Sequence, residues 1–383
     1  MAVDLLRTRR WTARFEVSVF SALLMHAGLV LPVVLLLTST FLTSAHAARW
    51  DWSGSVSVDQ KLLDLANPEE DTNSGEIVEW ALKTTVEVSD KVTANVKLCT
   101  TCHGLTVDQA YAEVRFHPLL GMEAGRINVP FGDYYLRHDP ANDKLGSKPL
   151  PYAMGHMVRF RADQFNLGVV PMPYSDQGVS FFGDAWFRDS IQLWYAAYAV
   201  NGFRAATPRD FNFKNQVADG SFIDNNHEPA LGGRVGIAQE HVSLGASYMT
   251  GAYDADSDYD YDVWGVDLGA TLGSIHFRSE YLERTTNVLA EDVRRDLTKR
   301  GFYMQAEVPV GRYLEFVGRF DGLVREGPIL GTSNDESSGI GRWTAGLNIA
   351  PSIDYTFRMS YEYWRFTDFS DVRLVHLGVV VSY

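Results

Sequence analysis

The stretch IDYTFRMSYE, residues 353–362, alternates strictly between two kinds of side chain. Its odd-numbered positions carry Ile, Tyr, Phe, Met and Tyr, whereas its even-numbered positions carry Asp, Thr, Arg, Ser and Glu. A period of two places successive side chains on opposite faces of a β-strand. The stretch therefore predicts a strand with one apolar and one polar face.

The same alternation recurs along the chain, in residues 77–88, 302–310 and 314–321 among others. From residue 50 onward no segment shows a sustained helical period, so the sequence predicts an all-β protein. We expect strands near 53–63, 77–88, 92–100, 106–117, 122–130, 178–188, 190–202, 231–239, 241–252, 261–272, 274–284, 300–310, 312–323, 339–349, 353–366 and 372–383.

The connections between these strands distinguish a membrane barrel from a soluble sandwich, which also alternates. Very short turns alternate with long polar connections, and this arrangement is typical of outer-membrane barrels with an even number of strands. Sixteen strands place both chain ends on the periplasmic side. The short turns are 89–91, 239–241, 272–274, 311–312 and 351–352, and the long connections are around 65–75, 133–178, 203–230, 253–260, 285–299 and 325–338.

The connection at 133–178 is too long for an ordinary loop. We expect it to fold into the barrel as a constriction loop, because side chains alone cannot fill the lumen of a larger barrel. A hidden hairpin within it is the alternative, and it would raise the strand number to eighteen.

The last strand has an unbroken apolar face that ends at Tyr383, the terminal residue. In this it resembles the bacterial outer-membrane porins, whose final strand ends in an aromatic residue that the barrel assembly machinery reads. The usual terminal residue there is Phe, so Tyr383 departs from the pattern. The segment QAYAEVRFHPLLGMEAGRINVPFG at 109–132, with YAVNG at 198–202, resembles the phosphate-selective porin O and P type.

The first 47 residues have the features of a secretory signal peptide. Arginines precede an uncharged stretch at 17–46, and Ala45-His46-Ala47 provides a small-x-small cleavage site. We predict cleavage after Ala47, with a retained membrane anchor as the alternative. Residues 48–383 then form the barrel, which we expect in the bacterial outer membrane with the lipid bilayer around it.

Composition and motifs exclude other classes of protein. The net charge of -14 argues against a nucleic-acid partner. A mean hydropathy of -0.13 is too low for a bundle of membrane helices. No nucleophile elbow, zinc-protease motif, phosphate loop or dinucleotide fingerprint is present, so we predict no enzymatic activity and no metal site.

The polar faces of the strands are expected to line the lumen. Acidic side chains outnumber basic ones there, and neighbours such as Glu113 and Arg115 have opposite charge. This pattern predicts a weak cation preference at most. The predicted lumen residues are Glu79, Lys83, Glu87, Lys97, Glu113, Arg115, His276, Arg278, Glu280, Glu307, Glu315, Arg319, Asp321, Asp354, Arg358 and Glu362.

The resemblance to the O and P type implies instead that basic side chains guide anions. Their candidate equivalents at the constriction are Arg126, Arg137, His138, Lys144, Lys148, Arg159 and Arg161. The same segment also contains Asp133, Asp139, Asp143 and Asp163, which leaves the charge selectivity open.

Cys99, Cys102 and His103 form a C-x-x-C-H motif, the attachment sequence of c-type haem. Because the motif falls in a predicted hairpin and not in a helical domain, we favour a Cys99–Cys102 disulfide in an oxidising compartment. A covalent haem, or a transition-metal site, is the alternative. No cofactor is expected under the favoured interpretation.

The sequence thus predicts a passive diffusion channel for small hydrophilic solutes or ions, and its alternative is a haem-bearing barrel that transfers electrons across the outer membrane. A homotrimer is a further expectation, which the resemblance to the porins implies, and small residues on lipid-facing strands would be its sign in the sequence. Gly265, Gly269, Ala270 and Gly273 are the candidates for that contact.

Overall fold

The computed structural model describes residues 48–63, 75–101, 104–137, 139–152, 168–171, 174–188, 190–205, 207, 224–328, 335–367 and 370–383. The predicted signal peptide lies outside these residues. Within them, no helix is long and apolar enough to cross a membrane.

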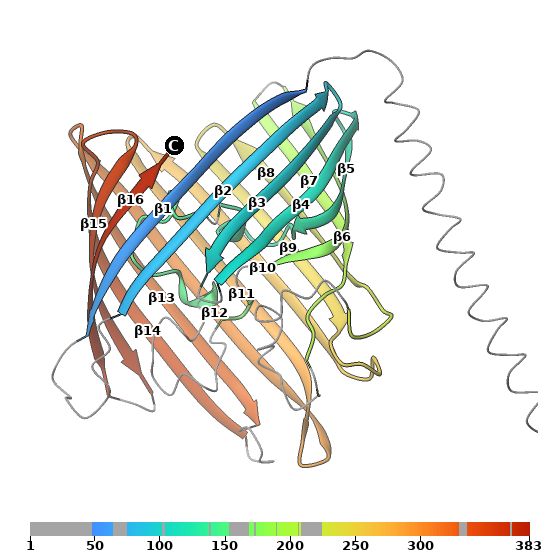
Figure 1. The fold of residues 1–383 in the computed structure, drawn as a ribbon. Helices are drawn as coiled ribbons and strands as arrows, with labels where there is room; N and C mark the ends of the chain where they lie inside the picture. The colour runs from blue at the N-terminus through green and yellow to red at the C-terminus, as the bar shows by residue number, and fades with distance from the viewer. Residues whose placement is uncertain are drawn as a thin grey trace, which may run out of the picture. The chain divides into compact units, whose positions relative to one another are not determined.

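Sixteen antiparallel strands form one closed barrel, in which each strand pairs with its sequence neighbours and β1 pairs with β16 (Figure 1). The predicted sixteen-stranded barrel is confirmed. Because β5 pairs directly with β6, the eighteen-stranded alternative is wrong. The strands are β1 (Arg49–Leu63), β2 (Gly75–Ser89), β3 (Val92–Thr101), β4 (Gly104–His117), β5 (Leu120–Asn128), β6 (Ser175–Phe187), β7 (Ile191–Val200), β8 (Ala230–Gln239), β9 (Val242–Ala252), β10 (Asp260–Leu272), β11 (Ile275–Ala290), β12 (Val293–Val310), β13 (Leu314–Pro328), β14 (Asp335–Ile349), β15 (Tyr355–Phe366) and β16 (Val372–Ser382).

The two faces of each strand meet different surroundings, as the alternation predicts. On β15 the outward Phe357 and Met359 are 47% and 48% exposed, whereas the inward Arg358 and Ser360 are 6% and 2% exposed. In a soluble protein this arrangement would place apolar side chains in water. It is the arrangement expected of a barrel surrounded by hydrocarbon, with a polar interior.

Aromatic side chains on the outer face form a belt across β10 to β15. Neighbouring rings are in contact, with centroids 5.3 Å apart for Trp264 and Tyr281 and 4.8 Å apart for Phe320 and Trp343. Phe302 and Tyr363 extend the belt on either side of this second pair. Such girdles lie where a barrel meets the membrane–water interface.

The C-terminal residue takes part in closing the barrel. Tyr383 and Gly54 exchange two backbone hydrogen bonds of 3.0 Å, next to the β1–β16 ladder. A Cβ atom at position 54 would lie 2.3 Å from the Tyr383 hydroxyl, so only glycine leaves room for this ring. The terminal aromatic side chain is therefore accommodated by the first strand.

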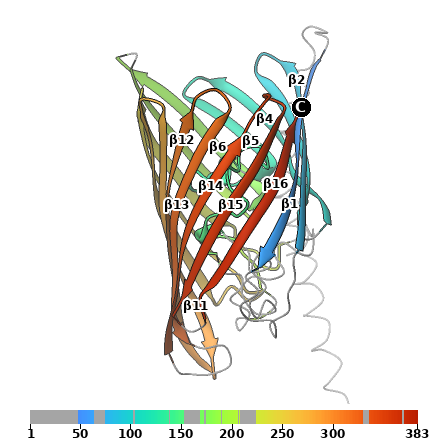
Figure 2. The ribbon, with the colours of Figure 1, turned by 90° about the vertical axis from the view of Figure 1, so that its left-hand side faces the viewer.

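The structure corrects the predicted loop at 285–299. Strands β11 and β12 run through this segment and turn only at Glu291 and Asp292, both of which have positive φ (Figure 2). Beyond the aromatic belt the outward face of these strands carries mostly polar side chains as well, so the alternation fades although the ladder continues. The outward Arg300 illustrates this, because it pairs with Glu283 and Glu326 on the adjoining strands.

The proposed lipid-facing patch of small residues on β10 is also wrong. Gly265 pairs with Leu282, which is fully buried on the inward face, and Gly265 and Gly269 share that face by alternation. Gly273 lies in the turn after the strand. These glycines therefore provide no basis for a contact between copies of the chain.

Candidate functional site

The connection between β5 and β6 spans residues 129–174, and its described residues, 129–137, 139–152, 168–171 and 174, lie in the interior of the barrel; we call them the inward loop. Its described parts include two short 3-10 helices, η1 (Tyr135–Arg137) and η2 (Leu150–Tyr152). Contacts of η2 with β12 and β13 place the loop against the far wall of the barrel. The predicted fold of a barrel with an inward constriction loop is thus confirmed.

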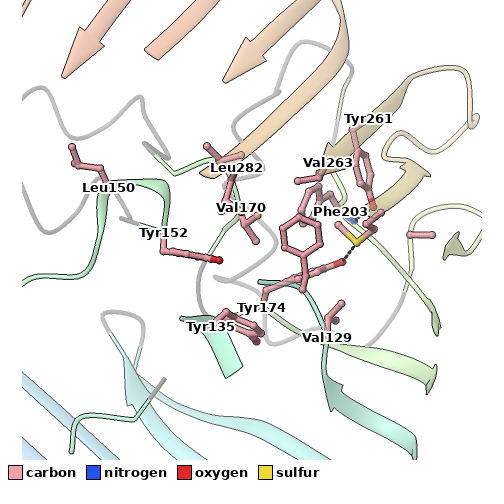
Figure 3. Packing of buried hydrophobic residues seen from close by; sticks show 14 of the residues in the cluster. Val129, Tyr135, Leu150, Tyr152, Val170, Tyr174, Phe203, Tyr261, Val263 and Leu282 are labelled. Carbon is pink, nitrogen blue, oxygen red and sulfur yellow. Dashed lines mark hydrogen bonds between the residues drawn. The ribbon is translucent and has the colours of Figure 1, made fainter. Parts of the chain in front are cut away.

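An aromatic core fixes one side of the inward loop. Tyr174 packs against Phe203 with ring centroids 5.0 Å apart, and Phe203 stacks on Tyr261 of β10 at 4.4 Å (Figure 3). All three side chains are at most 1% exposed. This packing occupies part of the lumen on the side of the barrel where the long loops lie, which we call the long-loop end.

Glu280 of β11 anchors two separate parts of the loop. Its carboxylate accepts a hydrogen bond of 2.5 Å from the backbone N–H of Tyr134 and another of 2.5 Å from the hydroxyl of Tyr152. Tyr303 of β12 donates a third, at 2.8 Å. Because Glu280 is 2% exposed, these donors replace the water that its carboxylate would otherwise bind.

A second anchor lies on β13 and β14. The guanidinium of Arg342 donates two hydrogen bonds. One, of 2.9 Å, runs from Nε to Asp321 Oδ1, and the other, of 2.5 Å, runs from Nη2 to the carbonyl oxygen of Lys148. Asp321 in turn accepts a hydrogen bond of 3.0 Å from the backbone N–H of Leu150. Arg319 donates a hydrogen bond of 2.7 Å to the hydroxyl of Ser147. The loop backbone is therefore held by a buried ionic network in the barrel wall.

A third anchor joins β1 and β15 to the loop. Arg358 of β15 donates a hydrogen bond of 2.7 Å through Nε to Asp59 of β1 and one of 3.0 Å through Nη1 to the carbonyl oxygen of Asp143. Burial raises the pKa of Asp143 to about 6, although the nearby Lys148 ammonium and the Tyr134 hydroxyl favour its charged form. The loop thus becomes less acidic as the pH falls below about 6.

The predicted basic candidates are ion-paired or hydrogen-bonded where they are described. Lys148 lies 2.8 Å from Glu79 and Lys144 lies 3.2 Å from Glu315, so both fasten the loop to the wall. Arg137 pairs with Asp133, and Arg126 donates 3.1 Å to the carbonyl oxygen of Asp108. The remaining candidates, His138, Arg159 and Arg161, lie outside the described residues.

Glu113 and Arg115 form the expected pair, with a separation of 3.3 Å. Several wall residues with buried ion pairs, however, were not singled out from the sequence, namely Asp59, Asp108, Arg234 and Arg342. Each lies on the polar face of a strand, and alternation alone would have found Arg342 in the sequence IGRWTAGLN. Alternation does not reveal which of these side chains touch the loop.

A cavity of about 330 Å³ lies between the inward loop and the wall formed by β2 to β8. It opens toward the side of the short turns, the short-turn end, because its wall includes Glu123 and Trp194, each three residues from the turn end of its strand. A second cavity, of about 20 Å³, lies beside Arg137 and Arg319. Of these two cavities, only the larger has the volume for a small solute.

The cysteine motif is described only at Cys99. This side chain lies on β3, is 5% exposed, and places Sγ 3.5 Å from Oγ1 of Thr106 on β4. Cys102 and His103 lie outside the described residues, so both the disulfide and the haem attachment stay predictions.

The described barrel is similar to solved structures of outer-membrane proteins. OmpF of Salmonella typhi in complex with daunomycin aligns with a TM-score of 0.59 at 10% identity, over 87% of this chain and 97% of that chain. OmpT, an outer membrane protein of Vibrio cholerae, aligns with a TM-score of 0.58 at 12% identity, over 89% of this chain and 99% of that chain. Another structure of OmpT is a trimer form.

An anion-selective porin from Comamonas acidovorans aligns with a TM-score of 0.57 at 11% identity, over 88% of this chain and 100% of that chain. No model of a protein family and no curated protein matches the chain. At these identities the likeness concerns the fold alone. The chain folds as a closed, sixteen-stranded barrel of the porin type.

Proposed function

We propose that the protein is a porin of the bacterial outer membrane, a passive diffusion channel for small hydrophilic solutes or ions. The observation that carries this proposal is a barrel with an apolar outer face and a polar interior, narrowed by a loop that the wall holds in place. An outward face rich in exposed apolar side chains is stable only in hydrocarbon.

The phosphate-selective O and P type is a narrower hypothesis. Lys144 and Lys148, two of its candidate anion guides, are neutralised by Glu315 and Glu79. Paired charges in a lumen produce little net field, so we propose weak charge selectivity for this channel. The anion-selective porin shares the fold, and fold alone does not set the permeant.

The channel is expected to produce discrete current steps when the purified protein is added to a planar lipid bilayer. In a gradient of potassium chloride the reversal potential should stay near zero, because the basic and acidic side chains that hold the inward loop are paired with one another. If three copies assemble, as in the trimer form of OmpT, closures should occur in three equal levels. A protein that inserts and yet conducts no current would contradict the proposed function.

Electron transfer through a covalent haem is the alternative function that the C-x-x-C-H motif suggests. We favour the channel because Cys99 is enclosed between two strands. The detergent-purified protein is therefore expected to be colourless after dithionite reduction, with a mass that matches residues 48–383 without added haem. A Soret band together with a mass raised by one haem would establish the alternative instead.

A further inference from the structure

We propose that the cavity beneath the inward loop is a binding site for an uncharged, polyhydroxylated ring, a solute of the sugar class. The inference rests on the proposed channel function and names a solute that would pause in the channel. It is carried by the aromatic side chains, the balanced charges and the size of this cavity.

The volume of about 330 Å³ lies at the lower end of the range of roughly 300–1,000 Å³ that small-molecule sites occupy. The cavity is bounded on one side by the inward loop, through Pro130, Leu136 and Asp139, and on the other by the barrel wall. A cavity of this volume accepts a ligand of one or two sugar rings.

Trp194 of β7 provides an aromatic surface whose position is fixed. The guanidinium carbon of Arg234 lies 4.4 Å from the centroid of the indole, and Arg234 is itself held by Asp267 at 3.0 Å to each carboxylate oxygen. Gly236 on β8 is the residue paired with Trp194, and a Cβ atom added there would lie 2.0 Å from the indole ring. The ring is therefore held before any ligand arrives, which lowers the entropic cost of binding.

Two further rings line the same cavity, Phe182 of β6 and Tyr111 of β4. Aromatic faces suit the C–H faces of a sugar ring, since they bury apolar surface without covering the hydroxyl groups at the ring edge. Charged phosphate or carboxylate groups would gain nothing from these rings.

The polar side chains of the cavity supply both hydrogen-bond donors and acceptors. Lys97 pairs with Asp108 at 3.0 Å and Asp139 at 2.7 Å, so its charge is already compensated. Gln109 and Asn128 add amide groups. Lys83 has no ion pair with any described residue, and Glu123 is likewise unpaired in this part of the chain.

The charges of the lining argue for a neutral ligand. Three basic side chains, Lys83, Lys97 and Arg234, face three acidic ones, Asp108, Glu123 and Asp139. An anion that approached Lys83 would also enter the field of the carboxylates, whereas a purely apolar ligand would leave the polar groups unsatisfied. A hydroxyl group both donates and accepts, so it suits this mixture.

Glucose and maltose, added in turn to single channels in a planar bilayer, provide the test. Both sugars should reduce the ion current in a saturable manner, and Trp194→Ala should raise the half-blocking concentration by about tenfold. Trp194→Phe, which keeps an aromatic ring, should raise the half-blocking concentration by less. Trp343→Ala is the matched control, because Trp343 lies on the outer belt and is 46% exposed.

Equal block of the wild type and Trp194→Ala would overturn the proposal, and so would block by inorganic phosphate or benzoate in place of the sugars. Equilibrium dialysis of radiolabelled maltose against the detergent-solubilised protein gives a readout that needs no current. Saturable, Trp194-dependent binding without any current would refute the channel and support the site. Current without sugar block or binding would refute the site and leave the channel intact.

Discussion

Replacement of Arg342 by alanine is expected to lower the free energy of unfolding by about 3–5 kcal/mol and to increase the single-channel conductance. Arg342 is 1% exposed, and its loss would leave the buried carboxylate of Asp321 with Arg319, 3.3 Å away, as its remaining cationic partner. Removal of one member of a buried ion pair is costly because it leaves the partner charge less well compensated. The same substitution removes the hydrogen bond to the carbonyl oxygen of Lys148, so the inward loop is released from one wall.

Urea titration of the folded barrel in detergent measures the first effect, and planar-bilayer recording measures the second. Arg365→Ala is the matched control, since Arg365 lies on the same sheet in register with Gly341 but is exposed. It should change neither quantity. If Arg342→Ala lost stability without any gain in conductance, the inward loop would not be what narrows the channel.

Met359→Arg is expected to destabilise the membrane-inserted barrel by about 2–4 kcal/mol, the cost of a lipid-facing arginine near the bilayer midplane. Met359 lies outward on β15, between the belt residue Tyr363 and the short-turn end, and is 48% exposed. In water the same change would replace an exposed apolar side chain by a charged one at little cost. The sign of the effect therefore reports which solvent surrounds the barrel.

The comparison should use urea titration in lipid vesicles together with the amount of folded protein in the outer-membrane fraction of cells. Met359→Leu serves as the control, because it keeps the apolar character and nearly the same volume. If Met359→Arg were as stable as Met359→Leu in vesicles, the outer face of β15 would not contact lipid.

The strands were predictable because one physical constraint acts on every residue of the transmembrane region. Lipid on one side and a polar lumen on the other impose a period of two, as in residues 353–362. The constraint ends where the strands leave the membrane, which is why the ladder from Thr285 to Lys299 was expected to be a loop. Hydrogen bonding between strands continues there, but it leaves no hydropathy pattern.

The contents of the lumen were predictable only in part. The length of the connection between β5 and β6 indicated an inward loop, but the contacts of this loop depend on the register of the whole barrel. Lys148 meets Glu79, 69 residues away in sequence, and Arg342 meets the carbonyl oxygen of Lys148, 194 residues away. From the sequence, the basic residues in the loop were therefore interpreted as anion guides. In the folded chain Lys144 and Lys148 instead hold the loop to the barrel wall through ion pairs.

The cavity was the feature least accessible from the sequence. Trp194 alternates with Leu193 and Tyr195, two apolar neighbours that face outward, so nothing in the local pattern distinguishes it as a lumen residue. Its role follows from Arg234 and Gly236 on the next strand, whose identities matter only once the β7–β8 register is known.

Electron cryomicroscopy of the protein in lipid nanodiscs tests the central claim most directly, because it locates the bilayer and the lumen contents in one map. We predict a sixteen-stranded barrel with lipid at the level of Met359, the aromatic belt of Trp264, Tyr281, Phe320 and Trp343 at the membrane boundary, and density for residues 139–152 across the lumen. A barrel whose lumen is empty at that level, or whose lipid contacts a different face, would contradict the account.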